Sequence, residues 1–99
     1  MSNEAVYPSL NNKVVVITGG GSGIGESITR SFIKQGAKVA FLDFNEKDSI
    51  KLIKDLNTDN LHFEFCDLRD IEQLKNSIKK ISSKFGPIQI LVNNAARDD

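Results

Sequence analysis

The sequence has a single cysteine and no excess of charge of either sign. Its 13 basic and 13 acidic residues cancel, so no broad electrostatic field favours nucleic acid or an anionic membrane as a partner. Cys66 stands alone, which excludes an internal disulfide and suits a reducing compartment. With 39% hydrophobic and 26% charged residues, the composition is that of an ordinary globular domain.

Long hydrophobic runs are also missing. The first ten residues contain Glu4 and lack the apolar stretch of about 7–15 residues that a secretory signal needs. Apolar runs such as 14–17 are far shorter than the roughly 20 residues that cross a bilayer in a helix. We therefore expect a cytoplasmic chain with no membrane partner. Its 99 residues are too few for a separate substrate domain.

Four short segments are typical of strands. Residues 14–17, 39–42 and 88–92 are apolar at nearly every position, as strands buried on both faces of a parallel sheet must be. In residues 61–65, Leu, Phe and Phe alternate with polar neighbours, which predicts a strand with one less buried face.

The segments between these strands have helical periodicity. The clearest is 71–85, where apolar residues three and four apart share one face. These residues are Ile71, Leu74, Ile78, Ile81 and Phe85. Asp70 is positioned to cap the first turn, Gln73 can complete a capping box with it, and Gly86-Pro87 ends the helix.

Two further helices follow from shorter patterns. Ile24, Ile28 and Phe32 indicate a first helix that begins near Gly23 and ends at Gly36. Ile50, Ile53 and Leu56 indicate a second, capped by Asn45 with Asp48 three residues on. The resulting β-α-β-α-β-α-β order, joined by right-handed crossovers, predicts an α/β protein with a doubly wound parallel sheet. Residues 1–12 form an extension, with a turn at Asn11-Asn12.

A glycine-rich turn follows the first predicted strand. Residues 18–25 read Thr-Gly-Gly-Gly-Ser-Gly-Ile-Gly, and glycines allow a sharp turn and a close approach of bare backbone to a pyrophosphate. The helix that begins near Gly23 points its unpaired amides and positive dipole end at the same anion. A phosphate loop of the Gly-Lys-Ser type is excluded, because Glu26 follows Gly25. A tight turn that binds nothing is the simpler alternative.

This segment resembles the cofactor-binding signature of the short-chain dehydrogenase/reductase family. Three further motifs stand in that family's order: Asp43 at the end of the second strand, Asp67-Leu68 after the third, and Asn-Asn-Ala-Ala at 93–96 after the fourth. The resemblance covers residues 10–96. One departure is Ala96, where the family usually has glycine and where a methyl group would lie close to the cofactor.

Within the family, short loops are most similar to those of bacterial aldose dehydrogenases of the D-xylose type. They are Tyr-Pro-Ser-Leu at 7–10, the triple-glycine turn, and Arg-Asp-Asp at 97–99. This closer resemblance implies sugar-like alcohols as substrates.

The family resemblance also implies a Rossmann-type, three-layer α/β/α fold, of which this chain supplies strands in the order 3-2-1-4. The helix at 71–85 would then cover one sheet face alone and incompletely, and the fourth strand would have a free outer edge, which is a template for pairing. We therefore expect residues 13–99 to form a partial dinucleotide-binding domain. We also expect association of the chain with a copy of itself through that edge.

The resemblance further implies a bound dinucleotide, NAD rather than NADP. The implied contacts are Gly19, Gly21, Ser22, Gly23, Ile24, Gly25, Asp43, Phe44, Asp67, Leu68, Asn93, Ala95 and Ala96. Asp43 would accept from both adenosine ribose hydroxyls, whereas a 2′-phosphate would meet its negative charge. Neither Phe44 nor the glycine turn supplies a basic group to offset that charge. Helix capping is the alternative role of Asp43, although Asn45 is better placed for it.

The remaining contacts would lie further along the sheet. Asp67 would accept from the adenine amino group with Leu68 against the ring, although a plain turn residue is the alternative for Asp67. Asn93 would contact a ribose, with Ala95 packed near the same sugar, and Asn94 is expected to tie backbone groups together at the strand end.

Other reactive residues have simpler explanations. His62 has no partners at metal-ligand spacing, so we expect an exposed strand position and no metal site. The lysines of 71–85 lie on the polar side of that helix, and Cys66 is expected to be a small buried apolar group.

No catalytic residue is assigned. The family transfers hydride between nicotinamide and an alcohol or carbonyl carbon, with a tyrosine as general acid/base, a lysine four residues later and a serine that orients the substrate. The single tyrosine, Tyr7, precedes the first strand and has Asn11 four residues on. We therefore expect the chain alone to be inactive. The alternatives are a non-catalytic module that binds a nucleotide or partner, and a different doubly wound nucleotide or methyl-donor domain, which the motif at 93–95 disfavours.

Overall fold

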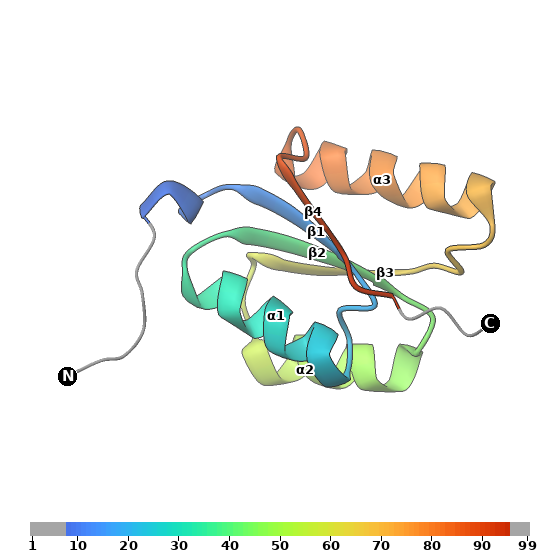
Figure 1. Ribbon diagram of the computed structural model, residues 1–99, viewed down its shortest axis with the longest axis horizontal. Helices are drawn as coiled ribbons and strands as arrows, with labels where there is room; N and C mark the ends of the chain where they lie inside the picture. The colour runs from blue at the N-terminus through green and yellow to red at the C-terminus, as the bar shows by residue number, and fades with distance from the viewer. Residues whose placement is uncertain (1–7, 96–99) are drawn as a thin grey trace.

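A four-stranded parallel sheet with helices on both faces organises residues 8–95, the part of the chain that the computed structural model describes (Figure 1). The elements are η1 (Pro8–Leu10), β1 (Val14–Thr18), α1 (Gly23–Lys34), β2 (Lys38–Asp43), α2 (Glu46–Leu56), β3 (Leu61–Phe65), α3 (Ile71–Phe85) and β4 (Ile90–Asn93). The strand order is β3-β2-β1-β4, and every neighbouring pair is parallel. The predicted Rossmann-type topology is confirmed.

The sheet separates two hydrophobic clusters. Helices α1 and α2 lie on one face and α3 lies on the other (Figure 1). The first cluster includes Val15, Ile17 and Phe41, and α1 and α2 pack against it. The second includes Val16 and Leu42, and α3 packs against it. Successive strand residues thus feed opposite layers, which is why these strands are apolar without alternation.

We expected α3 alone to leave part of its sheet face uncovered, and the uncovered apolar area is smaller than that expectation. All five residues of β1 are buried, so α3 suffices for the central strand. The exposed apolar side chain on this face belongs to β4, where Leu91 is 64% exposed and aligns with the buried Val16 of β1. The incompletely covered region is therefore the edge strand, not the sheet face as a whole.

Several apolar residues at the ends of elements are exposed, against the sequence prediction. Ile24 and Ile71 belong to the first turns of α1 and α3, and Phe65 is the last residue of β3. Ile50 of α2 is exposed as well. Hydrophobic periodicity assigns such residues to a face of the helix, but it does not indicate that the face has no neighbour there.

The fourth strand begins two residues later than predicted. Ile88 is apolar because it packs against the α3 cluster from the connecting loop, not because it lies in the strand. The next residue, Gln89, joins the loop to β1 twice: its backbone N–H donates to the Val14 carbonyl (3.0 Å), and its Oε1 accepts from the Val14 N–H (3.1 Å).

Both predicted helix caps are confirmed. The Asn45 side chain accepts from the Asp48 N–H (3.2 Å), and Asp70 accepts from the Gln73 N–H (3.1 Å). The prediction that Gln73 completes a capping box at α3 is wrong. The Gln73 side chain instead accepts from the Asp67 N–H (2.6 Å), and the Asp70 N–H is already bonded to the Asp67 carbonyl. Gln73 therefore fixes the loop before the helix.

The expectation that the His62 side chain is exposed is wrong. The side chain is half-buried beneath α3, with Nε2 2.5 Å from Glu64 and its ring edge-on to Phe85. Glu64, two residues on, lies on the same face of the strand and is the polar partner of the imidazole. No group of three His, Cys, Asp or Glu that could hold a metal ion occurs among residues 8–95.

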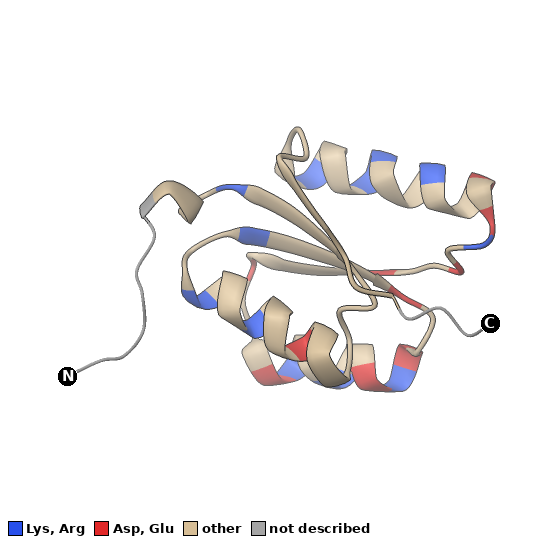
Figure 2. Ribbon diagram, in the orientation of Figure 1, with Lys and Arg blue, Asp and Glu red and all other residues tan. Residues whose placement is uncertain are grey.

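Charges of both signs are distributed over the surface (Figure 2). The lysines of α3 are exposed, as predicted, although Lys80 reaches back to Glu64 of β3 (3.9 Å). Within the described part of the chain, no helix has the length and apolar character needed to cross a membrane.

Candidate functional site

A pocket of about 1130 Å³ opens where the carboxyl ends of the four strands meet. Its lining residues are Gly19, Ser22, Ile24, Gly25, Leu42, Asp43, Phe44, Cys66, Asp67, Leu68, Arg69, Asn93, Asn94 and Ala95. Each strand or the loop after it contributes to this wall. In open α/β sheets, ligands bind in the crevice at this end of the strands.

Most of the residues that the sequence indicated line this one pocket. Gly21 and Gly23 do not: Gly21 is buried behind the turn, and Gly23 is exposed at the start of α1. Ala96 lies outside the described residues. The sequence prediction also missed lining residues, namely Leu42, Cys66, Arg69 and Asn94. Arg69 could have been found from its position two residues after a turn aspartate, where an arginine can return to the carboxylate.

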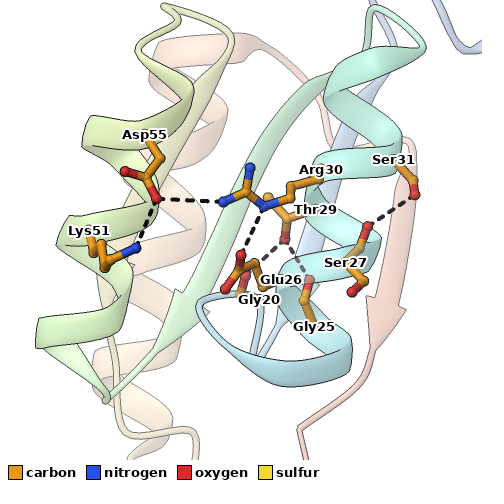
Figure 3. A network of polar contacts seen from close by, with 9 residues as sticks. All are labelled: Gly20, Gly25, Glu26, Ser27, Thr29, Arg30, Ser31, Lys51 and Asp55. Carbon is orange, nitrogen blue, oxygen red and sulfur yellow. Dashed lines mark hydrogen bonds and ion pairs between the residues drawn. The ribbon is translucent and has the colours of Figure 1, made fainter.

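The glycine turn is compact because side chains are excluded from it. A β-carbon on Gly25 would overlap the Gly19 carbonyl oxygen, and one on Gly21 would overlap the Ser49 hydroxyl. The buried Thr29 hydroxyl lies within 3.0 Å of the Gly20 carbonyl and 2.9 Å of the Gly25 carbonyl (Figure 3). The turn is thus fixed against the first helix from behind.

The N-terminus of α1 faces the pocket without a side-chain cap. Ser22, at the N-cap position, is extended and its side chain makes no capping hydrogen bond. The first amides of a helix have no intrahelical acceptor, and they carry the positive end of the helix dipole. With Ser22, Ile24 and Gly25 all in the lining, this end of the pocket is suited to an anion.

Thr18 joins the ends of β1 and β4. Its hydroxyl donates to Asn93 Oδ1 (3.0 Å) and accepts from the N–H groups of Asn94 (2.8 Å) and Ala95 (3.1 Å). The Asn94 side chain then donates to the Gly19 carbonyl (3.1 Å). Asn94 therefore ties backbone groups together, as predicted, while the organising role of Thr18 was not predicted.

Asp43, at the end of β2, holds the glycine turn and the start of the next loop. Its Oδ2 accepts from the Gly21 N–H (3.0 Å) and its Oδ1 from the Asn45 N–H (2.9 Å). It does not cap α2, because Asn45 does so. Each carboxylate oxygen retains a lone pair for a further donor in the pocket.

Asp67 and Arg69 form a two-pronged ion pair on the opposite wall. Arg69 Nη2 lies 3.0 Å from Asp67 Oδ2 and Arg69 Nε lies 3.1 Å from Oδ1. The Arg69 backbone N–H also donates to Oδ1 (3.0 Å). The hydrogen bonds from Arg69 lower the pKa of the Asp67 carboxyl, and the carboxylate in turn raises the pKa of Arg69.

Cys66 lies behind this pair and is fully buried. Burial raises the pKa of its thiol, partly offset by a hydrogen bond with Ser77. The thiol is therefore protonated near neutral pH, and it acts as a small apolar group of the wall.

Comparisons with known proteins agree with this geometry. The model of the short chain dehydrogenase family matches residues 13–99. A D-xylose 1-dehydrogenase from Caulobacter vibrioides is 44% identical, with 98% of this chain and 38% of that protein covered. A probable galactose dehydrogenase from Rhizobium meliloti is 40% identical, with 94% and 38% covered.

One solved structure of a similar protein contains a cofactor. A 3-ketoacyl-(acyl-carrier-protein) reductase from Brucella melitensis, complexed with NADH, superposes with a TM-score of 0.78 at 32% identity, over 83% of this chain and 34% of that one. The chain thus spans little more than a third of the length of the proteins it matches.

Proposed function

Because the chain belongs to the short-chain dehydrogenase family, we propose that its pocket binds NAD as the cofactor half of an oxidoreductase. The observation that carries this proposal is the juxtaposition of Asp43 with the uncapped N-terminus of α1 in one pocket. An anion-binding helix end beside a carboxylate at the end of the second strand is the arrangement that a dinucleotide requires.

The pyrophosphate would lie against the backbone from Ser22 to Ile24. Its negative charge is favoured by the dipole of α1, and the compact glycine turn lets it approach the backbone. The helix dipole and the backbone amides therefore bind the pyrophosphate without a lysine or arginine side chain.

The adenosine ribose would be bound by Asp43, whose two oxygens could accept from both hydroxyls. A 2′-phosphate would meet this carboxylate, so NAD is favoured over NADP. Arg69 is the arginine of the pocket lining, but its guanidinium is engaged with Asp67. It therefore does not offset the charge of Asp43.

The adenine edge would meet Asp67 and Leu68. Asp67 can accept from the amino group at C6, and the Leu68 N–H has no acceptor among residues 8–95, so it can donate to ring N1. Asn93 and Ala95 would lie near the second ribose.

Hydride transfer would involve a sugar-like or other secondary alcohol or its carbonyl. The similarity to the D-xylose and galactose dehydrogenases supports this substrate class. The chain contains one tyrosine, Tyr7, with no lysine four residues later, so we infer that residues 13–99 are the cofactor-binding part and that catalysis requires residues beyond them. Because this tyrosine–lysine pair is missing from the sequence, a non-catalytic nucleotide-binding module is the second candidate function.

Asp43→Ala tests the proposed cofactor site. We expect NAD binding to weaken by about 1.5–3 kcal/mol, the range for hydrogen bonds to a charged group, while NADP binding weakens less or improves. Isothermal titration calorimetry with NAD, NADP and ADP-ribose measures this directly. ADP-ribose should bind about as well as NAD if the nicotinamide side makes few contacts in this chain.

Two further variants serve as controls for the Asp43 experiment. Asp43→Asn keeps an acceptor for the Gly21 N–H but removes the charge, so it separates ribose binding from collapse of the turn. Asp55→Ala removes an aspartate of α2 that pairs with Lys51 and Arg30, away from the pocket (Figure 3), and should leave binding unchanged. Equal NAD affinity for wild type and both Asp43 variants would contradict the proposed role.

The edge of β4 supports a second part of the proposal, that the chain pairs with a copy of itself. Light scattering should give a mass above the 10.9 kDa of one chain, and Leu91→Lys should lower it by placing a charge in the contact. Ile71→Lys, at an exposed position on α3, should not. A mass of one chain for the wild type at micromolar concentration would contradict self-association.

A further inference from the structure

The ion pair between Arg69 and Asp67 fixes a carboxylate that would otherwise rotate. Arg69 is 91% exposed and Asp67 39% exposed at their side chains. An exposed pair of this kind contributes little to the free energy of unfolding. Its two-pronged geometry, however, allows one orientation of the carboxylate, since both guanidinium nitrogens must meet their oxygens in one plane.

The backbone beneath the pair is held as well. The Asp67 N–H donates to Gln73 Oε1 (2.6 Å), and the Asp67 carbonyl accepts from the Asp70 N–H (2.9 Å). The carboxylate thus stands on a loop anchored to the first turn of α3. Its position in the pocket wall is defined by hydrogen bonds from both sides.

The count of acceptor sites on Asp67 leaves one free. An ionised carboxylate offers about four lone-pair directions. Oδ1 accepts from the Arg69 N–H and from Nε, which uses its capacity, whereas Oδ2 accepts from Nη2 alone. One acceptor site therefore remains, on Oδ2. Leu68, the next residue along the chain, also lines the pocket, and its backbone N–H has no acceptor among residues 8–95.

We propose, on the basis of the function above, that Arg69 is a positioning residue that makes this pocket selective for a 6-aminopurine over a 6-oxopurine dinucleotide. A 6-amino group can donate to the remaining site on Oδ2 while ring N1 accepts from the Leu68 N–H. A 6-oxo group presents an oxygen to the carboxylate and an N–H at N1 to the backbone N–H. Both contacts then become repulsive, because the carboxylate cannot turn away from them.

Arg69 is thus distinct from a charge that merely attracts the cofactor. A point charge at this position would leave the carboxylate free to rotate and to accept from the N1–H of the oxopurine instead. The planar fork of the guanidinium removes that option, whereas a lysine ammonium would not.

Calorimetric titration of the chain with NAD and with nicotinamide hypoxanthine dinucleotide tests the proposal. We expect the wild type to bind NAD about tenfold or more tightly than the hypoxanthine analogue, the lower end for a hydrogen bond to a charged group. Arg69→Gln and Arg69→Lys should both reduce this ratio to about twofold. Arg30→Gln removes an arginine paired with Glu26 and Asp55 outside the pocket (Figure 3) and should keep the wild-type ratio.

A second readout follows the carboxylate itself. Because hydrogen bonds from Arg69 lower the pKa of Asp67, Arg69→Gln should raise that pKa toward its ordinary value. Titration of the Asp67 side-chain carbon by NMR detects the change, and Arg30→Gln should not produce it. This also predicts that selection between the two bases persists in the wild type to lower pH than in Arg69→Gln.

The possible outcomes separate the two proposals. A wild type that binds NAD and the hypoxanthine analogue equally overturns the role of Arg69 and leaves the cofactor site intact. A ratio retained in Arg69→Lys overturns positioning by the fork and assigns the effect to charge. Tighter NAD binding by Arg69→Gln would show that the arginine blocks Asp67. A folded wild type that binds neither dinucleotide overturns the proposed function itself.

Discussion

Replacing Gly25 with alanine should destabilise the protein by at least about 3 kcal/mol, the upper part of the range for overpacking, and abolish dinucleotide binding. Gly25 lies within α1, where alanine ordinarily stabilises a helix by about 0.5–1 kcal/mol relative to glycine. Here the added β-carbon would overlap the Gly19 carbonyl oxygen and meet the Asn94 side chain. The backbone of the turn cannot move aside without losing the bond between Asn94 and Gly19.

Chemical denaturation of Gly25→Ala gives the change in stability, and calorimetry with NAD gives the change in binding. Gly23→Ala is the matched control: apart from its chain neighbours and the backbone of its own helix, an added β-carbon there meets none of the described residues within 4 Å, although φ is +58°. It should cost about 1–2 kcal/mol for the left-handed backbone alone. A Gly25→Ala protein as stable as the wild type would show that the turn is looser than the contacts indicate.

Replacing Thr18 with valine should cost about 2–6 kcal/mol of stability, since it removes the acceptor of two backbone N–H groups at about 1–3 kcal/mol each. The amides of Asn94 and Ala95 would lose their partner, and the loop after β4 would detach from the end of β1. Thr18→Ser keeps the hydroxyl and should cost no more than about 1 kcal/mol for one lost methyl group.

Hydrogen exchange localises the effect of Thr18→Val. The amides of Asn94 and Ala95 should exchange faster in the valine variant and as slowly as wild type in the serine variant. Equal protection in both variants would show that another group holds this loop.

The sequence predicted the fold where periodicity and chain-end signals agree. For α3, five apolar residues at helical spacing, a capping aspartate and a terminal glycine define the observed Ile71–Phe85. The start of β4 was misassigned because Ile88 is buried from a loop, and a linear pattern does not distinguish that burial from burial in a strand.

The sequence predicted the part of the site that its motifs define. The glycine turn and the ends of three other strands converge on the pocket as their order implied. Arg69 meets Asp67 within the same turn, where its spacing was a usable signal that the motifs did not include. The hydrogen bonds of Thr18, in contrast, depend on how the loop after β4 folds back onto the end of β1. Those contacts follow from tertiary geometry, so residue spacing alone does not show them.

The hydrogen bond between Asp43 and the Gly21 amide bears on how cofactor preference can change during evolution. The residue proposed to exclude a 2′-phosphate also supports the turn that would bind the pyrophosphate. A mutation of Asp43 to an apolar residue leaves a buried amide without an acceptor, at about 1–3 kcal/mol, before any gain in NADP binding is realised. Substitutions in contact are not additive, so the order in which they arise matters. We expect a viable path toward NADP to pass first through Asn or Ser at position 43, which preserve an acceptor, and only then to add a basic residue nearby.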